Sequence, residues 1–170
     1  MVKSRAWTGV KHAAWVVPAL VTFSDLAASV LQVKGESMQP TLNGDPDICD
    51  WVLVEKLTCK WLYQYERGSV VVLWAPDNPH QQLVKRLVAL EGDLVWQDGK
   101  AKPTQIPQGR CWIEGDNKAV SQDSTTVYGP VHLGLMEGRV THVVWPPGHW
   151  RRVASYVPKD RVVEQDITRF

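Results

Sequence analysis

Short runs of β-branched, aliphatic and aromatic residues, bounded by glycine, proline, asparagine or aspartate, constrain this fold more than any other sequence feature. Such runs between turn residues are typical of strands, and no strong helical pattern follows residue 34. We therefore predict a mainly β domain over residues 34–150, with a hairpin at Asp98-Gly99-Lys100, a long polar loop from Gly115 to Pro130, and a polar, partly disordered tail over residues 151–170. The predicted strands are Trp51–Glu55, Ser69–Trp74, Gln82–Leu90, Leu94–Trp96, Arg110–Glu114 and Arg139–Trp145.

An apolar segment, residues 13–31, precedes this domain, and its only charged residue is Asp25. Its length is close to the roughly 20 residues that a helix needs to cross a bilayer. Its valines, leucines and phenylalanine favour insertion by about 2.4 to 4.8 kcal/mol in all, against about 2.5 to 3.5 kcal/mol for an aspartate at the membrane centre. We predict a marginally inserting anchor over residues 13–33. A helix lying in the membrane interface and a buried core helix are the alternatives.

The residues that flank the apolar segment predict its orientation. Residues 1–12 carry lysine and arginine but no acidic residue. By the positive-inside rule, this basic N-terminal flank lies on the cytoplasm-like side of the membrane, and everything after Leu31 lies on the other side.

Composition excludes some classes of protein. A formal net charge of +1 over 170 residues leaves no strong electrostatic footprint for nucleic acid. The three cysteines, Cys49, Cys59 and Cys111, form no CxxC pair and no metal-like cluster with the histidines. We interpret them as thiols, with a Cys49–Cys59 bridge as the alternative.

A serine lies in a stiff bend immediately after the apolar segment. Gly35 permits backbone angles that other residues resist, while Pro40 fixes its own φ and pushes Gln39 towards an extended conformation. Ser37 is therefore presented on a constrained stretch just past the membrane boundary. Most loop serines are merely solvated, so a catalytic role for this one depends on a base elsewhere in the chain.

Two kinds of base are available to Ser37. A histidine paired with Asp123 would complete a triad, but no GxSxG elbow surrounds the serine. The other candidate is Lys85, which lies beside Arg86 in an apolar β run. Adjacent strand residues face opposite sides, so we expect one of these cations to point inward. Burial lowers the pKa of a lysine and yields the neutral amine that a base requires, whereas a solvated lysine on an edge strand would have no such role.

Four stretches follow the apolar segment in a fixed order. They are Glu36-Ser37-Met38-Gln39-Pro40-Thr41-Leu42, then Arg67-Gly68-Ser69-Val70-Val71, then Lys85-Arg86-Leu87-Val88-Ala89-Leu90-Glu91-Gly92-Asp93, and finally Gly115-Asp116-Asn117 with Ser121-Gln122-Asp123-Ser124 and Tyr128-Gly129-Pro130. In this order, behind an N-terminal anchor, they resemble the successive boxes of type I signal peptidases. Each stretch is weak alone, but the ordered set, over about residues 13–146, is a strong signal.

The resemblance implies a serine endopeptidase with a Ser-Lys dyad on a signal-peptidase-like β-barrel or β-sandwich. Ser37 would be the nucleophile, its backbone N–H would donate to the oxyanion, and Lys85 would be the general base. Ser121 would orient the lysine amine, and Asp123 would brace that loop. The cleavage region of the substrate would lie beside the site as an added strand, with small side chains in shallow apolar pockets. No metal or cofactor is implied.

Two positions depart from the family pattern. Gly35 stands where many members carry a serine whose hydroxyl helps to hold the oxyanion, so the second oxyanion donor is not identified. Thr125 stands where many members carry an arginine, which leaves Asp123 without that ion-pair partner. The second departure, together with Trp145-Pro146-Pro147, favours similarity to one subunit of the mitochondrial inner-membrane peptidases over its companion subunit and the bacterial enzymes, which usually carry that arginine.

The mitochondrial inner-membrane peptidases imply a place and a partner. The chain would remove sorting signals from proteins delivered to the mitochondrial intermembrane space, with its catalytic domain in that compartment. A homologous companion subunit would be its partner, and Asp25 would contact a helix of that subunit. The alternatives are a bacterial or thylakoidal signal peptidase and, as a non-enzyme, a membrane-tethered β domain that only scaffolds a peptidase complex.

Overall fold

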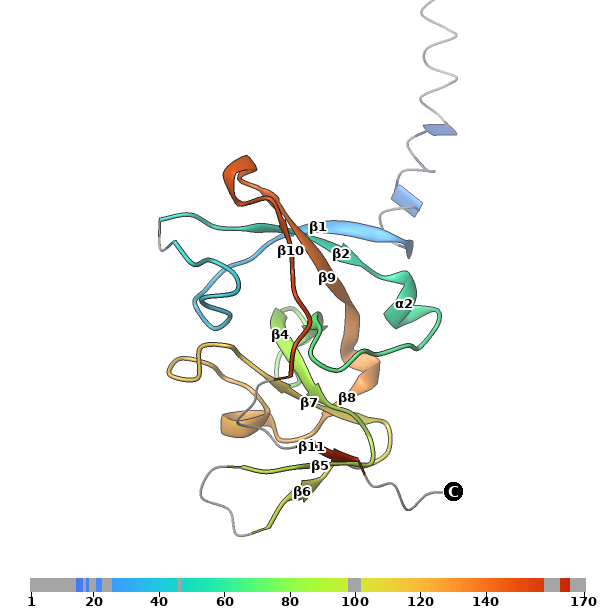
Figure 1. Cartoon of the computed structure of the whole chain (residues 1–170). Helices are drawn as coiled ribbons and strands as arrows, with labels where there is room; N and C mark the ends of the chain where they lie inside the picture. Colours follow the sequence, from blue (N-terminus) through green and yellow to red (C-terminus); the bar gives the residue numbers. More distant parts are fainter. Residues whose placement is uncertain are drawn as a thin grey trace, which may run out of the picture.

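The computed structural model describes residues 15, 16, 18, 21, 22, 26–45, 47–97, 102–157 and 163–165. Two antiparallel sheets dominate them (Figure 1). The larger sheet has the spatial order β1-β2-β9-β3-β4-β7-β8, with β10 paired to β9, and the smaller has the order β11-β5-β6. The strands are β1 Ala28–Gln32, β2 Trp51–Glu55, β3 Val70–Trp74, β4 Gln82–Ala89, β5 Asp93–Val95, β6 Thr104–Gln105, β7 Arg110–Glu114, β8 Val131–His132, β9 Met136–Trp145, β10 Arg151–Arg152 and β11 Val163–Gln165.

Short helical segments connect some of these strands. They are the α-helix α2 Leu57–Lys60, the π-helical turn η1 Ser124–Tyr128, and the 3-10 turns η2 Leu133–Leu135 and η3 Pro147–His149. The predicted mainly β domain is thus confirmed, and each predicted strand coincides with an observed one to within a few residues. The predicted hairpin turn at residues 98–100 lies outside the described residues.

Strand β3 separates two hydrophobic layers of the core. Val70 and Val72 pack into one layer, while Val71 and Leu73 pack into the other. None of these side chains is more than 1 % exposed. Burial of a valine or leucine side chain stabilises the fold by roughly 1.5–3 kcal/mol. The unbroken apolar run of the sequence is therefore explained by a strand that is covered on both faces.

The C-terminal end of the predicted anchor, residues 13–33, is a strand and not a helix. Ala28–Gln32 form β1, which pairs with β2 from Ala28↔Glu55 to Gln32↔Trp51. Backbone hydrogen bonds along this ladder override a helical preference that was weak in sequence. Within the described ranges, no helix has both the length and the apolar character needed to cross a membrane. Asp25 and the basic flank, residues 1–12, lie outside those ranges.

The start of the predicted polar tail, residues 151–170, also belongs to the fold. Arg151 and Arg152 form β10 and pair with Val143 and His142 of β9. Val153 then enters the core layer that contains Val70 and is 8 % exposed. Further along, the backbone of β11 pairs with β5. A strand pair and one buried valine are enough to order a stretch whose composition is largely polar.

The three cysteines are free thiols, so the Cys49–Cys59 bridge is not formed. Burial raises the pKa of Cys59 to about 11 and the pKa of Cys111 to about 12. Both groups are therefore protonated at neutral pH and behave as small hydrophobic side chains.

Gly68 and Gly92 provide a matched test of how the chain packs near β4. Their φ angles are +83° and +85°, but an added Cβ at Gly68 would lie 2.6–2.8 Å from backbone atoms of Tyr156, whereas nothing lies within 4 Å of the Gly92 position. A positive φ alone costs an alanine about 1–3 kcal/mol. We expect Gly68→Ala to lower the thermal unfolding midpoint several degrees further than Gly92→Ala, because it adds a backbone clash. Equal midpoints would contradict this packing.

Candidate active site

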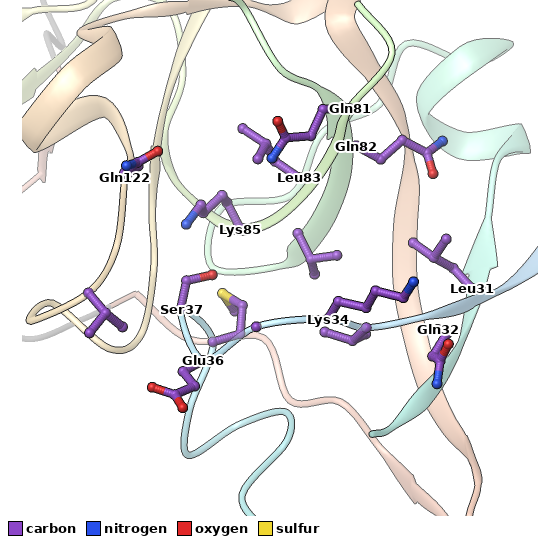
Figure 2. Close-up of a pocket in the computed structure, with 15 residues that line it drawn as sticks. Leu31, Gln32, Lys34, Glu36, Ser37, Gln81, Gln82, Leu83, Lys85 and Gln122 are labelled. Atoms are coloured by element: carbon purple, nitrogen blue, oxygen red, sulfur yellow. The ribbon is translucent and has the colours of Figure 1, made fainter. Parts of the chain in front are cut away.

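Ser37 lies in a turn that follows β1 and is fixed to the core on its C-terminal side. Met38 and Leu42 are 2 % and 0 % exposed, and the Leu42 N–H donates to Met38 O at 2.9 Å. Gly35, with φ of +88°, allows the chain to bend just before the serine. The apolar residues of the turn are therefore buried, while the Ser37 hydroxyl faces a pocket (Figure 2).

Lys85 and Arg86 are both buried, although the sequence predicted that only one would point inward. They are 3 % and 0 % exposed. Successive strand residues face opposite sides, and β4 is covered on both faces, so each cation is surrounded by a different part of the molecule. Lys85 projects into the pocket that contains Ser37.

The pocket has a volume of about 530 Å³ and is lined by two of the predicted site residues, Ser37 and Lys85, and by Gln122, which lies between the other two in sequence. Figure 2 shows the side chains of Lys85 and Ser37 in this pocket. Lys85 Nζ donates a hydrogen bond of 2.9 Å to Ser121 Oγ. This arrangement can supply a nucleophile, a base and a group that holds the base in place.

Burial is the main influence on the acid–base chemistry of Lys85. Loss of hydration lowers the pKa of this amine below the ordinary lysine value, and the negative charge of Asp123 raises it in part. A lowered pKa increases the fraction of neutral amine, which is the form that accepts a proton.

Asp123 organises the loop that carries Ser121. Its two carboxylate oxygens accept hydrogen bonds of 3.0 Å from the N–H groups of Gly115 and Thr125. It thereby caps η1, the turn that begins at Ser124. The arginine that Thr125 replaces in the family pattern is thus not needed to hold this carboxylate, because backbone donors bind it.

Gly115 allows three segments to meet behind the pocket. A Cβ at this position would lie 2.3 Å from Ser121 Oγ and 2.5 Å from Ser37 O. Two residues later, the Asn117 N–H donates to the same Ser37 carbonyl at 3.0 Å. The turn that carries Ser37 and the Ser121 side chain that binds Lys85 are therefore separated by a residue without a side chain.

Arg86 is neutralised within a buried network that sequence reasoning did not identify. Its guanidinium makes two hydrogen bonds with Asp116, of 2.8 and 2.7 Å, and donates to Gly68 O at 2.6 Å. Asp116 also accepts from the Thr41 hydroxyl, which lies in the same turn as Ser37. These residues occur in the quoted sequence stretches, but a pairing across 30 positions leaves no local pattern.

No histidine among the described residues lines this pocket. The described histidines therefore do not form the triad with Asp123 that the sequence left open. Within the same residues, no group of histidine, cysteine, aspartate and glutamate side chains is arranged to hold a metal ion.

The sequence matches the signal peptidase family, peptidase S26, over residues 7–101. Because this match covers more than half of the chain, the chain belongs to that family and is a serine peptidase. The family predicted from the ordered sequence stretches is thus confirmed.

Several relatives that match the chain are named as subunits of a mitochondrial inner membrane protease. Mitochondrial inner membrane protease subunit 2 of Mus musculus is 43% identical over 147 residues, which cover 85% of this chain and 83% of the relative. The same subunit of Saccharomyces cerevisiae is 39% identical over 140 residues, with coverage of 79% and 77%. Subunit 1 of Schizosaccharomyces pombe is 38% identical over 123 residues, with coverage of 71% and 76%. The predicted similarity to mitochondrial members of the family is confirmed, and it includes subunit 2.

Gly115→Ala should inactivate the peptidase. The new Cβ must push Ser121 or the Ser37 backbone away, and a misplacement of about 1 Å in a catalytic group can cost roughly a hundredfold in rate. Gly134→Ala is the matched control, because nothing lies within 4 Å of its Cβ position. Cleavage rates of both purified full-length variants on one precursor would be compared. Wild-type activity in Gly115→Ala would contradict the spacing described above.

Proposed function

We propose that this chain is a membrane-bound endopeptidase that uses a Ser37–Lys85 dyad to remove sorting sequences from proteins targeted to the mitochondrial intermembrane space. The single observation that carries the proposal is the Lys85 amine, buried in one pocket with Ser37 and hydrogen bonded to Ser121 Oγ at 2.9 Å. The names of the relatives support the substrate class and the compartment.

The reaction follows from the positions of these groups. Neutral Lys85 accepts the proton of Ser37 Oγ while that oxygen attacks the carbonyl carbon of the scissile peptide bond. The Ser37 N–H, for which the described part of the chain offers no acceptor, donates to the oxyanion. Lys85 then gives its proton to the leaving amine as the C–N bond breaks, which leaves an ester on Ser37. A water molecule, deprotonated by Lys85, hydrolyses the ester and restores the serine.

The substrate is held as an extended strand in the same pocket. The pocket runs between the end of β1, with residues 31–34, and the start of β4, with residues 81–85. Within the described residues, β1 pairs only with β2, and the Gln82–Lys85 part of β4 pairs only with β3. Both edges therefore have backbone groups free to pair with a peptide. Apolar side chains such as Leu83 and Val84 favour small apolar residues near the cleavage site.

The membrane anchor and the partner belong to the same proposal. A spanning helix would have to end before Ala28, where β1 begins, and would reach Ser37 only through β1. The basic flank would stay on the matrix side, with the catalytic domain in the intermembrane space. A homologous companion subunit would complete the complex, and the names of the relatives as subunits 1 and 2 support this pairing.

Separate Ser37→Ala and Lys85→Ala substitutions should each reduce processing of a presequence-bearing precursor by at least about a thousandfold, because neither member of the dyad acts alone. Ser155→Ala and Lys102→Ala, both at exposed positions, are the matched controls. Precursor and mature forms would be separated by gel after incubation with the full chain and its companion. Processing that persists in both dyad variants would favour the scaffold alternative, and localisation of a tagged chain tests the bacterial or thylakoidal one.

The pH dependence of cleavage tests the role of Lys85 as the base. The rate should rise with an apparent pKa below the value of about 10.4 for a free lysine. Because the Asp123 charge raises the pKa of Lys85, Asp123→Asn should move the rising limb to lower pH. Asp47→Asn, at an exposed position, should leave it in place. A limb near pH 6.5 in every variant would indicate a histidine base instead.

A further inference from the structure

A buried carboxylate lies beside the nucleophile turn and takes no part in the reaction described above. Asp50, immediately before β2, is 0 % exposed. Its Oδ2 accepts from the Asn43 N–H at 3.0 Å and from Arg151 Nη2 at 3.1 Å. Its Oδ1 lies 3.1 Å from His149 Nδ1. A carboxylate with this degree of burial needs such partners, because an uncompensated buried charge is strongly destabilising.

Asn43 connects Asp50 to both ends of the segment that contains Ser37. Its side-chain Oδ1 accepts from the Asp50 N–H at 2.8 Å. Its Nδ2 donates to Val33 O at 3.1 Å and to Gly35 O at 3.0 Å. The φ of Asn43 is +53°, a value that asparagine tolerates better than most residues. One amide thus fixes the chain before Ser37 to the chain after it.

Arg151 connects the same segment to the C-terminal hairpin formed by β9, η3 and β10. In addition to Asp50, its Nη2 donates to Thr41 O at 2.9 Å, and its Nη1 donates to His149 O at 3.0 Å. Thr41 lies four residues after Ser37, and its hydroxyl also donates to Asp116. The rigid guanidinium fork can hold a carboxylate and a carbonyl in one geometry, which a single ammonium cannot do equally well.

We propose that Asn43, Asp50 and Arg151 form a latch through which the C-terminal hairpin positions the Ser37 turn for attack. These are positioning residues, since none of them lines the pocket. The inference rests on the proposed function for the reaction that is measured. Arg151 contacts this segment at Thr41 O and at Asp50, neither of which lines the substrate pocket, so loss of the Arg151 contacts lowers kcat more than it changes KM.

The test compares Arg151→Gln with Arg152→Gln in the full-length chain assembled with its companion. Arg152 is the neighbouring exposed arginine, and its side chain makes no hydrogen bond within the described part of the chain. We expect Arg151→Gln to lower kcat about tenfold, the effect of losing hydrogen bonds to a charged group, and Arg152→Gln to leave kcat unchanged. KM should change by less than about twofold. The inhibition constant of a substrate peptide in which a reduced, non-cleavable bond replaces the scissile peptide bond should also change by less than about twofold.

Asn43→Gly provides a second route that does not depend on the arginine. Glycine accepts the positive φ, so this variant removes the amide contacts without adding strain. It should reproduce the loss of kcat. The Arg151→Gln, Asn43→Gly double variant should have about the same kcat as the less active of the two single variants, because both substitutions act through one network. Arg151→Lys, which keeps the charge but loses the fork, should fall between wild type and Arg151→Gln.

Several outcomes would overturn the latch. One is equal kcat for Arg151→Gln and Arg152→Gln, and another is a loss confined to KM. A third is a loss that follows the thermal unfolding midpoint and disappears when the assay is run well below that midpoint, which would indicate a purely structural role. If Ser37→Ala remains active in the same assay, the proposed function itself fails, and this result is separate from any result on the latch.

Discussion

The burial of two adjacent cations on opposite faces of β4 is the constraint on which the rest of the site depends. Arg86 cannot lose its proton, so the fold surrounds it with Asp116, backbone carbonyls and the ring of Tyr156, whose centroid lies 3.8 Å from the guanidinium carbon. Lys85 has a hydroxyl as its hydrogen-bond partner, and it can lose its proton. The permanent charge is therefore neutralised inside the structure, while the titratable one is able to accept and release a proton, as the proposed dyad requires.

The mainly β fold could be predicted because each strand leaves a local pattern of apolar residues between turns. The unbroken apolar run of β3 corresponds to a strand that is covered on both faces. Strand β1 could not be predicted, because Ala28–Gln32 resemble a continuation of the apolar segment until β2 is present to pair with them. The same applies to β10, where pairing with β9 orders two exposed arginines.

The candidate site also has residues that could be predicted from the sequence and contacts that could not. Ser37, Lys85, Ser121 and Asp123 could be proposed from ordered sequence stretches, and Gly115 lay within one of them. The contacts that position these residues were not predictable, because they join distant parts of the chain: Asn43 with Val33 and Gly35, Arg151 with Thr41, and Arg86 with Asp116. Adjacency of this kind depends on the order of strands in the sheet, which periodicity does not specify.

Strand β1 also acts as a spacer between the end of any N-terminal helix and Ser37. A strand advances about 3.3 Å per residue, so a five-residue strand extends over roughly 16 Å. For a chain anchored ahead of Ala28, that length fixes how far from the anchor a peptide bond can be cut. On the proposed function, a precursor held in the same membrane would have to bring its cleavage site to a serine that lies at least one strand length along the chain from the anchor. The distance between the anchor and Ser37, as well as the residues around the cleavage site, would then decide which peptide bonds are cleaved.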